Sequence, residues 1–145
     1  MQVRMRAATS ALVVASLAAA FACTSATQPA CDICAPNATV LGTVTSTSGA
    51  QLQRVGIRLD VRTPDCAQSL NFTTGTQTDP SGQYSGYIFV VSPLKACVIV
   101  SALPSPTSGF AGAVDTVPQL DFRNTWEPGV AADQARVDFV LQPLP

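Results

Sequence analysis

Five cysteines are the residues of this 145-residue chain whose types and spacing are best suited to chemistry. Cys31 and Cys34 form a CxxC pair, a spacing that elsewhere makes a redox centre or half of a zinc site. A redox pair belongs between a strand and a helix, whereas this one lies in a polar stretch that contains proline. A four-thiolate zinc site needs a second close pair, which Cys66 and Cys97 do not form. We therefore expect structural disulfides, no metal site and no cofactor.

The pairing of these four cysteines is not fixed by the sequence, because four cysteines allow three connectivities. We favour a bond between Cys66 and Cys97, since Cys66 follows a strand with a charged face and Cys97 lies in a later strand. Cys31 would then pair with Cys34. The main alternative joins the two N-terminal cysteines to the strands.

The N-terminus has the pattern of an export signal. Arg4 and Arg6 precede an uncharged run over residues 7–22, as in a secretory signal peptide. The run is shorter than the roughly 20 apolar residues that span a membrane. The fifth cysteine, Cys23, follows at once, and Ala20-Phe21-Ala22-Cys23 resembles a bacterial lipobox, whose cysteine is diacylated and becomes the mature N-terminus. We predict a signal peptide over 1–22 and a lipid on Cys23 at the cell envelope; soluble secretion is the alternative.

The net charge of the mature chain bears on which partners it could bind. Of eight basic residues, removal of Arg4 and Arg6 leaves six against nine acidic residues. The mature net charge is therefore about −3, which gives no reason to expect nucleic acid as a partner. We expect a membrane partner through the N-terminal lipid, and an unidentified protein or glycan partner.

The residue inventory bears on catalysis as well. The chain contains no histidine, so a Ser-His-Asp or Cys-His arrangement is impossible. Acidic residues gather in the C-terminal third and could form an acid and base pair, but their spacing matches no motif, and exposed loop acids are the commoner case. We therefore expect no catalytic residue and no enzyme. The acids concerned are Asp115, Asp121, Glu127, Asp133 and Asp138.

The hydrophobic pattern predicts strands. The clearest is Arg54 to Arg62, in which Val55, Ile57, Leu59 and Val61 alternate with mostly charged residues. Residues 23–38 are small and polar and indicate a tether. We predict an all-β fold, a small antiparallel β-sandwich of about seven strands over residues 39–145. The other expected strands cover 40–45, 69–78, 83–90, 96–103 and 136–141, with a weaker one near 113–117.

Three motifs in this region resemble the carboxypeptidase regulatory-like domains, which have a transthyretin-like (prealbumin-like) sandwich. They are Val40-x-Gly42-x-Val44, then Gly49 ahead of the alternating strand, then Thr78-Asp79-Pro80-Ser81-Gly82-Gln83-Tyr84. The resemblance covers residues 39–103 well and the C-terminal third poorly. It implies a non-catalytic module for binding, spacing or display, because such domains are mostly appended to secreted enzymes, surface proteins or outer-membrane receptors.

The last of these motifs has a mechanical interpretation. Asp79 can accept backbone N–H bonds across a tight turn, Pro80 presets its own φ, and Gly82 can adopt a positive φ. Tyr84 then begins the next strand pointing inward, where its hydroxyl needs a partner.

Two surface features are candidates for binding. Arg54, Arg58 and Arg62 form a row that could meet an anionic glycan or a lipid headgroup, although a solvated sheet face is the commoner case. Trp126, the single tryptophan, could stack with Phe122 on a sugar ring. Two hypotheses follow, an interaction or display module at the cell envelope and a carbohydrate-binding module of the starch-binding-like type. Exposure of Trp126 discriminates between them.

Overall fold

The computed structural model describes residues 35–145, so Cys23, Cys31 and Cys34 lie outside the described residues. Within residues 35–145 there are eight strands and no helix. The strands are β1 (Asn37–Ser46), β2 (Gly56–Arg62), β3 (Ser69–Gln77), β4 (Gln83–Phe89), β5 (Leu94–Leu103), β6 (Ala113–Phe122), β7 (Asp133–Arg136) and β8 (Phe139–Leu141). This confirms the predicted all-β fold.

No helix of residues 35–145 is long and apolar enough to cross a membrane.

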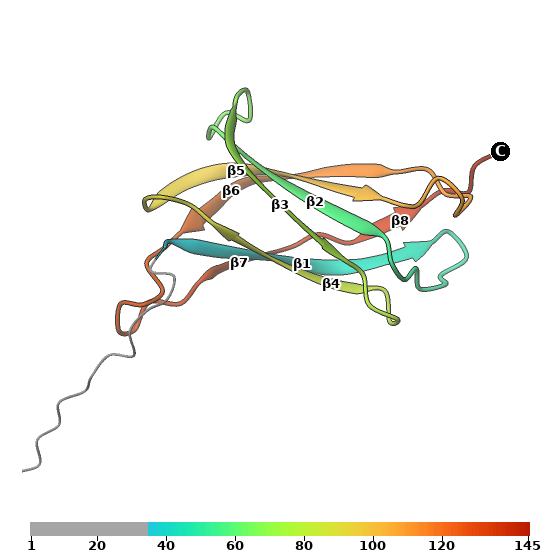
Figure 1. The fold of residues 1–145 in the computed structure, drawn as a ribbon, viewed down its shortest axis with the longest axis horizontal. Coiled ribbons are helices and arrows are strands. Elements are labelled where there is room, and N and C mark those ends of the chain that lie inside the picture. Colours follow the sequence, from blue (N-terminus) through green and yellow to red (C-terminus); the bar gives the residue numbers. More distant parts are fainter. Residues whose placement is uncertain (1–34) are drawn as a thin grey trace, which may run out of the picture. The chain divides into compact units, whose positions relative to one another are not determined.

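The strands form two sheets that pack face to face as a sandwich (Figure 1). One sheet has the order β4-β1-β7, with β8 also paired to β1, and the other has the order β3-β2-β5-β6. β4 runs antiparallel to β1, whereas β7 and β8 run parallel to it. The sandwich is therefore mixed rather than wholly antiparallel, because the long connection from β6 returns the chain to the start of β1.

Alternation along the strands places the core between the sheets. Ile57, Leu59 and Val61 of β2 are at most 2% exposed, and the intervening Arg58 is exposed. The predicted inner and outer faces of this strand are therefore confirmed. The opposite sheet supplies buried side chains in the same way, and the largest fully buried residues of both sheets include Phe122, Leu120, Ile88, Leu141, Val40, Val44, Val98 and Val100.

The predicted strand over 136–141 is divided into β7 and β8 at Val137 and Asp138. Val137 N–H still donates to Leu41 O at 2.9 Å. At the next position the Asp138 carboxylate accepts from Thr43 N–H at 2.7 Å. A side-chain oxygen thus takes the place of a backbone acceptor, so that the parallel pairing with β1 resumes at Phe139.

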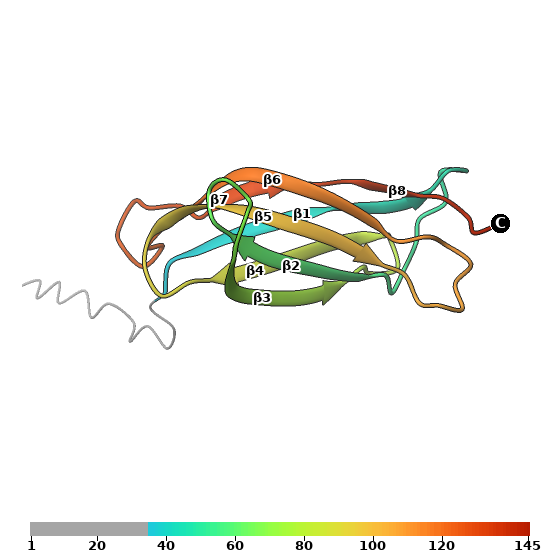
Figure 2. The same ribbon diagram turned by 90° about the horizontal axis from the view of Figure 1, so that it is seen from above.

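Different loops lie at the two ends of the sandwich. At one end β1 begins, and the turn over 90–93 and the loop over 123–132 lie beside it (Figures 1 and 2). The C-terminus lies at the other end in both views, with the loops over 47–55 and 104–112. We call the first of these the β1-entry end.

Candidate interaction surfaces

The turn before β4 is built around the Asp79 carboxylate. One of its oxygens accepts from Ser81 N–H at 2.8 Å, from Ser81 Oγ–H at 2.6 Å and from Gln83 N–H at 3.0 Å. The hydrogen bond from the Ser81 hydroxyl, followed by those from the two backbone N–H groups, holds the pKa of Asp79 below its usual range. This is the arrangement expected from the sequence.

Gly82 completes the turn with φ of +71°. A Cβ atom added at Gly82 would lie 2.8 Å from Val44 O, a distance that forces the backbone to move. Both observations agree with the expected role of this glycine, since a positive φ and a close backbone approach each favour the residue without a side chain.

Tyr84 points into the core as expected and finds its partner at the break between β7 and β8. Its hydroxyl donates to Val137 O at 2.7 Å, and burial raises the pKa of Tyr84, with the Asp138 and Asp115 charges adding to the effect. The contact is possible because Gly42, opposite Tyr84 in the β1–β4 pairing, leaves room. A Cβ at Gly42 would lie 1.8 Å from Val137 O. These residues therefore form a structural joint between β1, β4 and the C-terminal strands.

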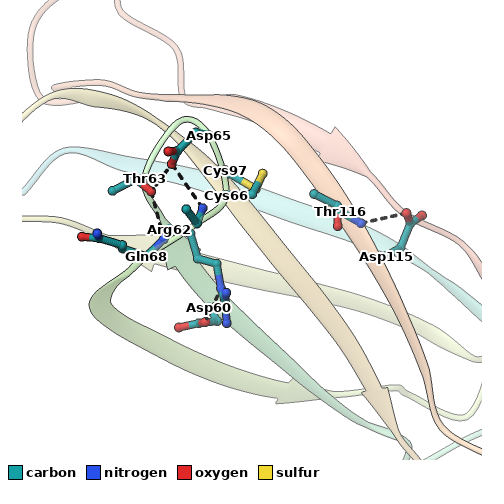
Figure 3. Close-up of a disulfide and its surroundings, with 10 residues drawn as sticks. Asp60, Arg62, Thr63, Asp65, Cys66, Gln68, Cys97, Asp115 and Thr116 are labelled. Carbon is teal, nitrogen blue, oxygen red and sulfur yellow. Dashed lines mark hydrogen bonds and ion pairs between the residues drawn. A yellow bond between two sulfur atoms is a disulfide. The ribbon is translucent and has the colours of Figure 1, made fainter.

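The Cys66–Cys97 disulfide is present, with a Cα–Cα separation of 5.3 Å (Figure 3). Cys97 lies on the outer face of β5 yet is fully buried, because the loop over 63–68 covers it. Within that loop Thr63 N–H donates to Gln68 O at 2.9 Å, and Cys66 N–H donates to Thr63 O at 2.7 Å. The predicted pairing is confirmed for these two cysteines, and the pairing of Cys31 with Cys34 stays a prediction.

A disulfide of this kind bears on where the domain works. Disulfides persist in oxidising compartments and are rare in the cytosol. The covalent attachment of the loop to β5 therefore favours an extracellular or cell-surface domain.

The three arginines are not brought together as one row. Arg58 and Arg62 lie on the outer face of β2, whereas Arg54 precedes the strand with φ of +58° and donates its N–H to Thr78 O. Asp60 lies between the first two, and its carboxylate accepts from Arg62 Nε at 3.0 Å. Burial raises the pKa of Asp60, but hydrogen bonds from Arg62, Ser69 and Thr73 and the Arg62 charge lower it by more. The outer face of β2 therefore carries one ion pair, between Arg62 and Asp60, and one further positive charge at Arg58.

Trp126 and Phe122 differ in how far their side chains are buried. Phe122 ends β6 inside the core at 0% exposure, so it cannot stack on a ligand, whereas Trp126 is 36% exposed in the loop over 123–132. The Asn124 amide in the same loop donates to Glu127 Oε1 at 2.7 Å. Because Phe122 is buried, the partly exposed Trp126 indole is a single ring and not half of a stacking pair.

A row of apolar side chains on the outer face of β4 was not among the surfaces expected from the sequence. Tyr87 is 62% exposed, Phe89 is 44% exposed, and Val91, just past the strand, is 84% exposed. The signal was present, because Tyr84, Ile88 and Val90 fill the inner face of a strand whose outer positions are also partly apolar. Because the sandwich has only two layers, nothing within residues 35–145 covers the outer face of β4.

The hollows on the surface of the sandwich are small. One of about 160 Å³ near the end of β6 is lined by Lys95, Asp121, Arg123 and Asp133. Asp133 accepts there from Asp121 N–H at 2.9 Å, so it caps the edge of β6. In residues 35–145 no three His, Cys, Asp or Glu side chains are grouped as metal ligands would be.

Comparison with known proteins identifies the fold but no sequence family. No protein-family model matches the chain, and no curated protein matches it in sequence. Among solved structures, 3-chlorocatechol 1,2-dioxygenase from Rhodococcus opacus 1CP is similar with a TM-score of 0.52 and 12% identity over 78% of this chain. Chlorocatechol 1,2-dioxygenase from Pseudomonas putida has a TM-score of 0.51 and 15% identity over 76% of this chain. The major plantain pollen allergen has a TM-score of 0.48 and 15% identity, and the match covers 74% of this chain and 94% of the allergen.

These comparisons correct one expectation. The expectation that enzymes can be excluded is wrong, because the two dioxygenases are enzymes that share this sandwich. The aligned region spans 62% and 61% of the two dioxygenase chains. At 12% and 15% identity the likeness shows the fold alone.

Proposed function

We propose that this chain is an exported interaction module, held at the cell envelope by a lipid on Cys23 and belonging to the carboxypeptidase regulatory-like sandwiches. The signal-like N-terminus supports export, and the disulfide between Cys66 and Cys97 supports an oxidising compartment. The turn geometry at Asp79 and Gly82 supports the family assignment, because the motif on which the resemblance rests is built as that assignment requires.

The observation that carries the interaction role is Tyr87, which is 62% exposed in the exposed apolar row on the outer face of β4. Contiguous exposed apolar surface on a monomeric protein is often a binding surface, so neighbouring exposed apolar side chains on one strand face support this role. Exposed serine and glutamine side chains continue the same face toward the start of β4, at Ser85 and Gln83. An aromatic ring among neutral hydrogen-bonding groups suits a protein or glycan surface better than a highly charged polymer.

Crosslinking in living cells tests the interaction role. A photo-crosslinking amino acid in place of Tyr87 is expected to give a discrete adduct in the producing cells. The matched control is Val114, which is 66% exposed on β6 of the other sheet. Equal yields at the two positions, or no adduct at position 87, would contradict the proposal.

A second candidate is carbohydrate binding through Trp126, favoured by the accessible indole. Stacking of a sugar on one ring would be weak without Phe122, so this candidate depends on Trp126 alone. Titration with soluble oligosaccharides tests it, because the single tryptophan reports binding by its own fluorescence. A Trp126→Phe variant should keep part of the affinity in a pull-down on insoluble polysaccharide, and Trp126→Ala should lose it. Equal retention of the two variants would contradict this candidate.

A further inference from the structure

The chain joins the sandwich between two exposed loops. Val90 N–H donates to Pro36 O at 3.0 Å, and Asn37 N–H donates to Arg123 O at 2.9 Å. Residues 36 and 37 are thereby fixed between the turn over 90–93 and the loop over 123–132, at the β1-entry end (Figures 1 and 2). Any anchor on the N-terminal side of Ala35 acts on the domain from this point.

The same end displays exposed apolar side chains on both sides of the entry point. Phe89 and Val91, 44% and 84% exposed, lie on the β4 side, and Trp126, 36% exposed, lies on the side of the loop over 123–132. Asn37 connects the two sides. It lies opposite Phe89 in the β1–β4 pairing, and its side-chain amide donates to Thr125 Oγ1 at 2.6 Å. The chain's single tryptophan is thus placed beside the point where the chain enters the domain.

We propose that the β1-entry end rests on the lipid surface that holds the Cys23 acyl chains, with Phe89, Val91 and Trp126 in the headgroup region. This inference rests on the proposed lipid anchor. Tryptophan and other aromatic residues are favoured at the boundary between water and hydrocarbon, where an apolar ring and a polar edge are both satisfied.

The length of chain between anchor and domain makes a weak contact sufficient. From Cys23 to Ala35 there are twelve residue steps, which span at most about 40 Å even when fully extended. A domain held so near the bilayer meets it at a high effective concentration, so a few apolar side chains can fix its orientation without providing the affinity.

Charge at this end permits the contact without driving it. Lys95 and Arg123 are accompanied by Asp121, Glu127 and Asp133, so the end is close to neutral. An anionic leaflet would neither strongly attract nor strongly repel it. The contact would therefore depend on apolar insertion and persist at high salt.

The opposite end provides a matched control. It exposes the aliphatic side chains Val140 and Leu144, at 58% and 52%, without an exposed large aromatic residue among those described. If exposed apolar area alone directed the domain to lipid, these residues would be as important as Phe89 and Val91.

The test uses the mature protein extracted from membranes and reconstituted into vesicles of phosphatidylethanolamine and phosphatidylglycerol. Flotation first reports whether the protein is held by the vesicles. Trp126 fluorescence then reports the surroundings of the indole. We expect a blue-shifted emission relative to the same protein in buffer without vesicles, and quenching when brominated phospholipids replace the ordinary ones.

In the Phe89→Ser/Val91→Ser variant the protein should still float, but most of the quenching should be lost. The Val140→Ser/Leu144→Ser variant should float and keep the quenching. Flotation of the unaltered protein with an unquenched Trp126 would overturn this inference alone and leave the exposed end to a protein partner. Failure to float would overturn the proposed anchor, and the inference with it.

Discussion

At the scale of single residues, the turn over residues 79–83 carries the resemblance on which the family assignment depends. Gly82 has φ of +71°, and a Cβ there would lie 2.8 Å from Val44 O. Gly82→Val should therefore be the most destabilising substitution in the turn, and backbone strain should lower the free energy of unfolding by about 1–3 kcal/mol. Asp79→Ala should come next, because two backbone N–H groups lose their acceptor. Gln83→Ala should be nearly silent.

Denaturant midpoints of the three variants check this order. The side chain of Gln83 is exposed, so it serves as the control for substitution at the turn itself. A harmless Gly82→Val would show that the reversal is not under the constraint described.

Acid should weaken the sandwich through its hydrogen-bonded carboxylates. At Asp138 burial raises the pKa, but hydrogen bonds from Arg136 and Thr43 and the Arg136 charge lower it by more. A carboxylate with a depressed pKa contributes stability that is complete above the unfolded value of about 3.9 and is lost as pH falls through the lower folded value. Unfolding midpoints should therefore be flat near neutral pH and fall below about pH 4.

Asp138→Asn is the matched variant for this pH effect. Its amide oxygen can still accept from Thr43 N–H, so the parallel pairing with β1 is retained while the titrating charge is removed. Its midpoint should fall less steeply with acid than that of the unaltered protein. An identical pH profile for both proteins would count against the role given to this carboxylate.

At the scale of strands, the two faces of β2 differ in what they tolerate. Leu59 is 0% exposed, so Leu59→Asp would bury an unpaired carboxylate and should cost more than about 4 kcal/mol, enough to unfold a marginally stable domain. Arg58→Ser on the outer face should change stability by less than about 0.5 kcal/mol. Thermal melts of the two variants decide, and equal losses would contradict the assignment of faces.

The Cys66–Cys97 disulfide joins the loop over 63–68 to β5, across a sequence separation of 31. In the chain-entropy account a loop of this length is worth about 3–4 kcal/mol. A double variant that combines Cys66→Ser with Cys97→Ala should lower the free energy of unfolding by that amount. Melts of the unaltered protein with and without reductant provide a second comparison. If neither the double variant nor the reductant changed the midpoint, the bond would not form.

Much of this fold could be predicted from period-2 alternation, and the exceptions have physical causes. The strand expected over 54–62 begins only at Gly56, because Arg54 adopts a positive φ that interrupts the extended chain. The break at Val137 and Asp138 depends on the Tyr84 hydroxyl and on Thr43, which are distant in sequence. Parallel pairing of β7 and β8 with β1 leaves no local signal either, since it is set by the connection over 123–132.

The candidate surfaces were harder to predict, for a related reason. A strand with apolar residues on both faces, as in β4, does not indicate which face lies in the core, and only the packing of the two sheets shows that Tyr87 and Phe89 face water. Phe122 and Trp126 are close in sequence, yet the end of β6 places one ring in the core and leaves the other accessible. Enzymes that share this sandwich also show that fold class could not exclude catalysis.

At the scale of the whole molecule, the two parts of the chain would have different tasks. The N-terminal segment would direct export and carry the lipid, and the part of the outer β4 face from Gln83 to Tyr87 would be presented to a partner, because Phe89 and Val91 would lie at the lipid surface. The β1-entry end would then fix the orientation of that face relative to the membrane. Lipid attachment at Cys23 is the claim on which this arrangement depends.

Intact-mass analysis of the protein from the cell envelope tests that claim most directly. We predict a mature chain that starts at Cys23, carries the mass of acyl groups and partitions with membranes. A Cys23→Ala variant should lose the added mass and leave the membrane fraction. A mature N-terminus at another residue, or an unmodified Cys23 on soluble protein, would contradict the lipid anchor.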